Sequence, residues 1–112
     1  MAQLGIFKNA IKNNIGNSFT TIYTAPALKT SYILECDIAS TGNTGVQISV
    51  RITDTSASTT AYVVKNAPVP VGSALQLIDG QKIVLEEGDT LQVKCETTGE
   101  VVDVIVSLVE DI

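Results

Sequence analysis

The sequence contains no histidine, no tryptophan and only two cysteines, Cys36 and Cys95. Zinc sites are built mainly from cysteine and histidine, and these two cysteines lack the CxxC spacing of zinc and redox motifs. The many serine and threonine hydroxyls have no imidazole to activate them, and no G-x-S-x-G sequence is present. We therefore expect a protein that is not an enzyme and that uses no metal and no cofactor.

Basic residues are also few, because seven Lys and Arg face twelve Asp and Glu, for a formal charge of −5. No Lys/Arg cluster interrupts this balance, so nucleic acid is not an expected partner. The longest apolar runs are far shorter than the roughly 20 residues that span a membrane, and no membrane contact is expected. The N-terminal residues MAQLGIFKNAIKNN lack the apolar region and cleavage site of a secretory signal, which predicts synthesis in a cytoplasm.

What the sequence does contain is apolar and polar residues in alternation, the pattern of strands with one buried face. The alternation is clear over residues 32–39 and again over residues 46–53, on either side of TGNTG. These two segments are predicted to form an antiparallel hairpin. Further strands are expected at residues 19–24, 61–64, 74–78, 83–85, 91–95 and 102–108, with Asp79-Gly80 as a tight turn.

About eight short strands separated by turns predict an all-β fold, a single antiparallel β-sandwich with jelly-roll or immunoglobulin-like connections. The sandwich domain is expected to cover residues 18–112, after an N-terminal arm or irregular segment at residues 1–17. Within that segment, residues 4–15 fit either a strand or a weak helical turn. Pro68 and Pro70 cannot donate ladder hydrogen bonds, so their segment is predicted to be an edge or a crossover. Both cysteines lie on inward faces, which predicts buried thiols; a disulfide is the alternative if the two strands meet face to face.

The stretch KIVLEEGDTLQV places Glu86, Glu87 and Asp89 around Gly88. Three carboxylates this close could contribute to a calcium site or to acid–base catalysis, but the spaced D-x-D-x-D pattern is missing and further ligands would have to come from elsewhere. We interpret the stretch as two strands joined by an acidic, solvated turn. We also interpret a second acidic group as solvated, a solvent-facing row on the last strand and a charged tail after it; its residues are Asp103, Glu110 and Asp111.

Three longer stretches carry a resemblance: IYTAPALKTSYILECDIAST, VQISVRITDTSASTTAYVVKNAPVPVGSALQLIDGQKIVLEEGDTLQVKCET and VVDVIVSLVEDI. From residue 22 to residue 112 the chain resembles small structural proteins of tailed bacteriophages, in which YTAPA, APVP and Gly-Asp elements recur. The resemblance implies a multi-copy β-sandwich of the virion, assembled in the bacterial host cytoplasm, of the neck or collar, capsid decoration or tail accessory type. The implied partners are copies of itself and other virion proteins. The alternative is a carbohydrate- or receptor-binding module of a tail or fibre.

The N-terminal segment offers candidate contact residues for such an assembly. Leu4, Ile6, Phe7 and Ile11 are apolar and lie outside the regular strand pattern. We hypothesise that they form an arm that reaches a neighbouring subunit.

Overall fold

The computed structural model describes residues 5–111, apart from the side chains of residues 79–81. Strands account for most of this part of the chain, and no helix in it is long and apolar enough to cross a membrane. The strands are β1 (Ile6–Ile15), β2 (Thr20–Thr24), β3 (Ser31–Ser40), β4 (Val46–Asp54), β5 (Thr59–Val69), β6 (Ala74–Leu85), β7 (Thr90–Cys95) and β8 (Val102–Glu110).

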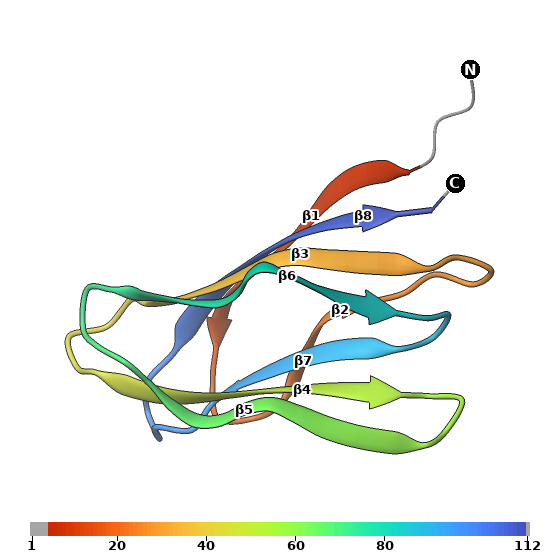
Figure 1. Cartoon of the computed structure of the whole chain (residues 1–112). Coiled ribbons are helices and arrows are strands. Elements are labelled where there is room, and N and C mark those ends of the chain that lie inside the picture. Colours follow the sequence, from red (N-terminus) through yellow and green to blue (C-terminus); the bar gives the residue numbers. More distant parts are fainter. Residues whose placement is uncertain (1–4, 112) are drawn as a thin grey trace.

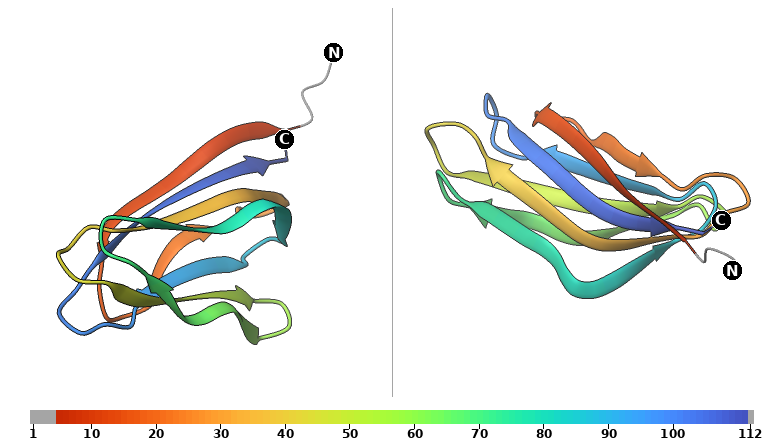
Figure 2. Two further views of the ribbon diagram at one scale, coloured as in Figure 1. Left: turned by 60° about the vertical axis from the view of Figure 1, so that its left-hand side comes forward. Right: turned by 90° about the horizontal axis from the view of Figure 1, so that it is seen from above.

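The strands form two four-stranded antiparallel sheets, ordered β1-β8-β3-β6 and β2-β7-β4-β5. Figures 1 and 2 show the sheets as two layers, which confirms the predicted sandwich. From β1 to β4, successive strands alternate between the two sheets. Within residues 5–111, β4 and β5 are the only two strands that follow each other in the chain and are also hydrogen-bonded to each other. An immunoglobulin sandwich would pair its first two strands in one sheet. The strand order is instead that of a jelly roll.

The hairpin predicted between residues 32–39 and 46–53 is wrong, although both segments are strands. They belong to β3 and β4, which lie in different sheets, and residues 41–45 carry the chain across the sandwich. Alternation shows which face of a strand is buried, but it does not identify the neighbouring strand. Here β3 is paired with β6 and β8, and β4 is paired with β5 and β7.

The tight turn predicted at Asp79-Gly80 is also wrong. Strand β6 runs without a break from Ala74 to Leu85, and both of its halves pair with β3. Between Ile33 and Glu35 the register shifts, so that β6 has extra residues there. A glycine within a strand often marks such a bulge, and the dipeptide that suggested a turn lies at this irregularity.

The segment expected to be an arm or an irregular piece contains the edge strand β1, paired with β8 from Ile6 opposite Glu110 to Ile15 opposite Val102. Of the two possibilities for residues 4–15, strand is therefore the one observed for residues 6–15. The proline-containing segment was predicted as an edge or a crossover, and Pro68 does lie in β5, the edge of the second sheet.

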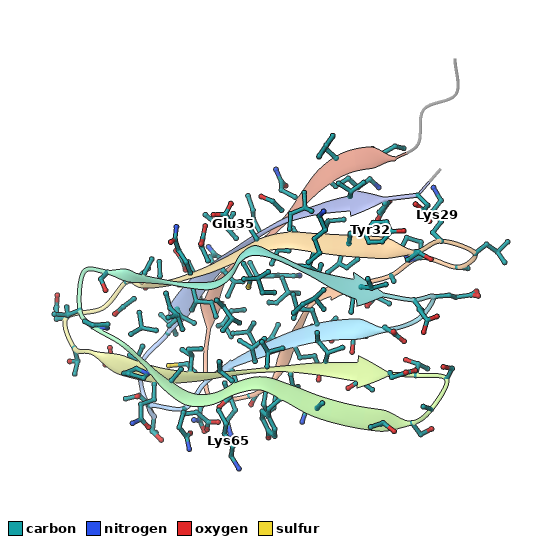
Figure 3. The ribbon with its side chains drawn as sticks, viewed as in Figure 1. Lys29, Tyr32, Glu35 and Lys65 are labelled. Carbon is teal, nitrogen blue, oxygen red and sulfur yellow. The ribbon has the colours of Figure 1, made fainter. Side chains whose placement is uncertain are left out.

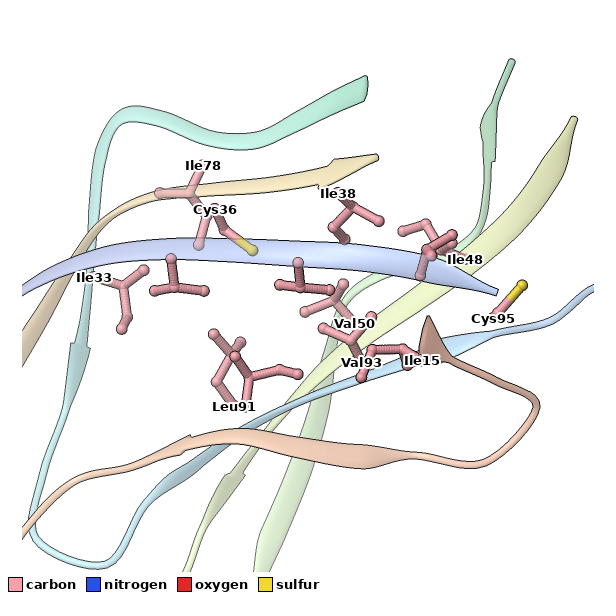
Figure 4. Close-up of a cluster of buried hydrophobic side chains, with 14 of the residues drawn as sticks. Ile15, Ile33, Cys36, Ile38, Ile48, Val50, Ile78, Leu91, Val93 and Cys95 are labelled. Carbon is pink, nitrogen blue, oxygen red and sulfur yellow. The ribbon is translucent and has the colours of Figure 1, made fainter. Parts of the chain in front are cut away.

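The core between the sheets consists mainly of Val, Ile and Leu (Figure 4). Cys36 of β3 and Cys95 at the end of β7 are both free and fully buried, as predicted. Burial raises the pKa of the Cys36 thiol to about 12, and it also raises the pKa of Cys95. Both thiols act as small apolar groups of the core.

Candidate interaction surface

The predicted contact residues lie at the outer edge of the first sheet. Leu4 falls outside the described residues, and Ile6 is half-buried at the start of β1. Phe7 and Ile11 are exposed by 79% and 60% of their surface. Two large apolar side chains therefore point away from the core on one strand.

An apolar row continues from Phe7 across the whole outer face of this sheet. Phe7 of β1 is opposite Val109 of β8, Val109 is opposite Tyr32 of β3, and Tyr32 is opposite Val84 of β6. Leu34 lies beside this row, where it lines a shallow depression together with Tyr32 and Val109. Because all four strands contribute to the row, sequence position alone could not have shown it.

A second row of the same face begins at Ile11, which is opposite Ile105 of β8, itself 49% exposed. Ile105 is opposite Asp37 of β3, whose neighbours Cys36 and Ile38 are fully buried, so Asp37 points outward.

Carboxylates surround these apolar residues. Glu35 points away from the sandwich (Figure 3), and Asp103 alternates with buried valines of β8. With Asp37 they make three carboxylates, and together with Lys82 these four side chains have a net charge of −2; Lys29 lies beside Tyr32 at the end of this side (Figure 3). One oxygen of Asp37, Oδ1, is buried and has no hydrogen-bond partner among the described residues. We call this side the acidic face, made of Phe7, Ile11, Tyr32, Leu34, Glu35, Asp37, Lys82, Val84, Asp103, Ile105 and Val109.

The outer face of the second sheet carries mainly cations instead of carboxylates. The Arg51 guanidinium lies 3.7 Å above the Phe19 ring, and the Lys94 ammonium lies 5.6 Å from the centre of the same ring. Phe19 is 6.1 Å from the ring of Tyr62, and Lys65 lies 5.3 Å from the Tyr62 ring centre. These are favourable cation–π distances.

One carboxylate, Glu96, accompanies these cations. It pairs with Lys94 at 3.0 Å and accepts a hydrogen bond from the Ser49 hydroxyl at 2.6 Å. These contacts, the Ser49 bond first, hold the pKa of Glu96 below its ordinary value. Three cations against one carboxylate give a net of +2. We call this side the basic face, made of Phe19, Arg51, Tyr62, Lys65, Lys94 and Glu96.

The acidic stretch after β6 forms the predicted turn. The Asp89 amide donates to the Glu86 carbonyl at 2.9 Å, and Gly88 has a φ of +83°, which glycine adopts without strain. The Glu87 carboxylate accepts a hydrogen bond from the Leu28 amide at 3.1 Å. The turn therefore lies against the connection between β2 and β3.

Asp89 departs from the expectation of a solvated turn, because only 4% of its surface is exposed. Its Oδ1 accepts a hydrogen bond from the Thr55 amide at 3.2 Å, and its Oδ2 accepts one from the Glu86 amide at 3.0 Å. The Thr55 hydroxyl also donates to the Gly88 carbonyl at 2.6 Å. Figure 1 shows the β2–β3, β4–β5 and β6–β7 connections at the same end of the sandwich, and Asp89 joins the last two.

The three carboxylates that gather at this end are Asp54, Glu86 and Asp89, whose oxygens lie within 4.8 Å of one another. The sequence pattern grouped Glu87 with Glu86 and Asp89 and gave no sign of Asp54, the last residue of β4. Asp54 Oδ1 accepts hydrogen bonds from the Ser56 hydroxyl and the Ala57 amide, and these bonds lower its pKa. The hydrogen bonds of Asp54 and Asp89 are those of turn-forming acids.

Glu110 also departs from the solvated row predicted for it. It is 3% exposed, pairs with Lys8 at 2.9 Å and accepts a short hydrogen bond from the Tyr23 hydroxyl, which also contacts Ser31 Oγ at 2.7 Å. The Tyr23 bond and then Lys8 lower the pKa of Glu110, whereas burial and the Glu110 bond raise the pKa of Tyr23 to about 12. This polar cluster connects β2 of one sheet to β8 of the other.

The strand order and the core define the class of this protein, a jelly-roll β-sandwich. No protein-family model matches the sequence, and no curated protein matches it.

Solved structures do share the fold. One is a chain of the Bacillus endospore appendages, described as disulfide-linked pili, with a TM-score of 0.56 at 13% identity over 98% of this chain and 88% of that one. Another is from the acid-stable capsid of Helicobacter pylori bacteriophage KHP30, with a TM-score of 0.56 at 9% identity over 100% of this chain and 90% of that one. At these identities the likeness shows a shared fold.

Proposed function

We propose that this protein is a non-enzymatic structural protein of a phage virion, present in many copies, that packs on the neck, collar or capsid surface and stabilises the particle. The observation that carries the proposal is the pair of apolar rows on the outer face of the first sheet. Phe7, Val84 and Ile105 are each about half exposed or more. Connected apolar surface of this kind marks a site that a partner covers.

Two further observations support an assembly role. The phage-like strand and turn motifs extend over residues 22–112, and a chain of the KHP30 capsid has the same fold. Charged residues make up only 17% of the chain, so a close contact between copies desolvates few ions. Within this function, the neck or collar is our preferred position, ahead of capsid decoration and of the tail.

The composition of purified particles tests the proposal. Quantitative mass spectrometry of virions from the phage that encodes this chain is expected to find it in many copies relative to the portal protein. Immunogold electron microscopy would then distinguish neck, capsid and tail. Particles that lack the protein would refute the virion role. Binding of a purified glycan by the isolated domain, together with a place on a fibre, would favour the receptor-binding alternative.

The contact role of the N-terminal residues predicts a selective loss of assembly. The double variant Phe7→Asn/Ile11→Asn should keep its melting temperature within a few degrees, because both side chains are mainly solvated. It should lose oligomers in light scattering and lose binding to particles. Leu28→Asn is the matched control, since Leu28 is 92% exposed in the β2–β3 connection, outside the four strands that form the acidic face. Equal behaviour of the double variant and this control would contradict the contact role.

A further inference from the structure

The two outer faces of the sandwich are complementary in charge and lie on opposite sides of the same molecule. In Figure 3, Glu35 points outward from the first sheet and Lys65 points outward from the second. The acidic face has a net charge of −2 and the basic face a net charge of +2 among described side chains. Because the faces are back to back, they cannot meet within one chain, but they can meet between two chains.

The centre of the acidic face contains an acceptor that no group in the described part of the chain satisfies. Asp37 Oδ1 is buried without a partner, and it lies next to exposed Ile105 in the second apolar row. A buried carboxylate oxygen without a donor is costly, and an approaching cation removes that cost. The basic face offers such donors on Arg51, Lys65 and Lys94, arranged around two aromatic rings that can cover apolar side chains.

The faces also have a suitable size. In the first sheet, four strands of 9 to 12 residues, about 4.8 Å apart and at about 3.3 Å per residue, cover roughly 600 Å² before side-chain relief is added. The strands of the second sheet have 5 to 11 residues, and that sheet covers roughly 500 Å². Specific interfaces bury about 600–1,000 Å² per partner, so one whole face packed against another comes near the lower end of that range once side-chain relief is added.

The geometry points to a head-to-tail contact in which the basic face of one copy docks on the acidic face of a second copy of this chain. This inference rests on the proposed multi-copy function and identifies the surfaces that join the copies. A contact between two different patches leaves one free patch of each kind at the ends of a dimer. Copies therefore add head to tail. They form a ring if the rotation that relates successive copies closes on itself, and a filament if it does not.

Charge reversal tests the contact by sedimentation velocity of the full chain. Glu35→Lys alters the acidic face, and Lys65→Glu alters the basic face. Each variant alone should weaken self-association at least about tenfold, because like charges then meet. An equimolar mixture of the two variants should recover association, since the intact basic face of one can dock on the intact acidic face of the other. Raising the salt concentration should also weaken the self-association of the wild type, because salt screens the attraction between the two faces.

A matched control changes the charge equally elsewhere. Glu86→Lys lies in the β6–β7 turn and should associate like the wild type. If both face variants associate normally, or if their mixture recovers nothing, the pairing of faces is overturned while a multi-copy role stands. A monomeric wild type at all concentrations overturns the proposed function as well. Retention of that monomer on a polyanion column, lost in Lys65→Glu, would instead assign the basic face to an acidic polymer.

Discussion

Asp89→Ala is expected to lower the free energy of unfolding by about 2–4 kcal/mol, because two backbone amides lose their buried charged acceptor. The amides belong to Thr55 and Glu86, so the substitution affects two connections at once. With Asp89 only 4% exposed, water cannot easily replace the carboxylate. Asp89→Asn should lose less, since its amide group keeps one carbonyl acceptor. Urea unfolding followed by circular dichroism measures the difference.

Glu87→Gln is the control from the same turn. Glu87 is exposed and accepts a single hydrogen bond, from the Leu28 amide, which a glutamine carbonyl can also accept. We expect a change within about 0.5 kcal/mol. Equal losses in Asp89→Ala and Glu87→Gln would show that Asp89 has no special part in holding the connections together.

Asp89 is buried and Glu87 is exposed, and this difference shows how much of the β6–β7 turn the sequence could predict. The Gly-Asp pattern predicted a turn correctly, because a turn depends on local residues such as Gly88 with its positive φ. The burial of Asp89 could not be predicted in the same way, because one of its donors, Thr55, lies 34 positions away in sequence. Asp54 was missed for the same reason.

For the fold, too, features set by neighbouring residues could be predicted, whereas contacts between residues far apart in the chain could not. Alternation located strands such as β3, β4 and β8, whose buried faces are set by their own residues. It misassigned the partner of β3, because in a jelly roll most neighbours are far apart in the chain. The sequence suggested the exposed apolar rows only at Phe7 and Ile11, where they begin, and Tyr32 and Val84 join the first row through pairings that a single sequence does not specify.

Tyr23→Phe is expected to lower the free energy of unfolding by about 1–2 kcal/mol at neutral pH and to change how stability depends on pH. The hydroxyl of Tyr23 is the main cause of the lowered pKa of Glu110. A carboxylate with a lowered pKa in the folded state stabilises the protein above its unfolded pKa, near 4.5, and this contribution is lost as the pH falls through the folded value. The stability difference between wild type and Tyr23→Phe should therefore shrink in acid.

The same difference should shrink in base, for the opposite reason. The pKa of Tyr23 is raised from 10.0 to about 12, so its contribution is complete below pH 10 and is lost as the pH rises from 10 to about 12. Denaturant unfolding across the pH range should give a plateau near neutrality that declines on both sides. Tyr62→Phe is the control, because the Tyr62 ring lies on the basic face, away from Glu110, and its difference from wild type should stay flat. A flat profile for Tyr23→Phe as well would mean that the contact between Tyr23 and Glu110 does not couple β2 to β8.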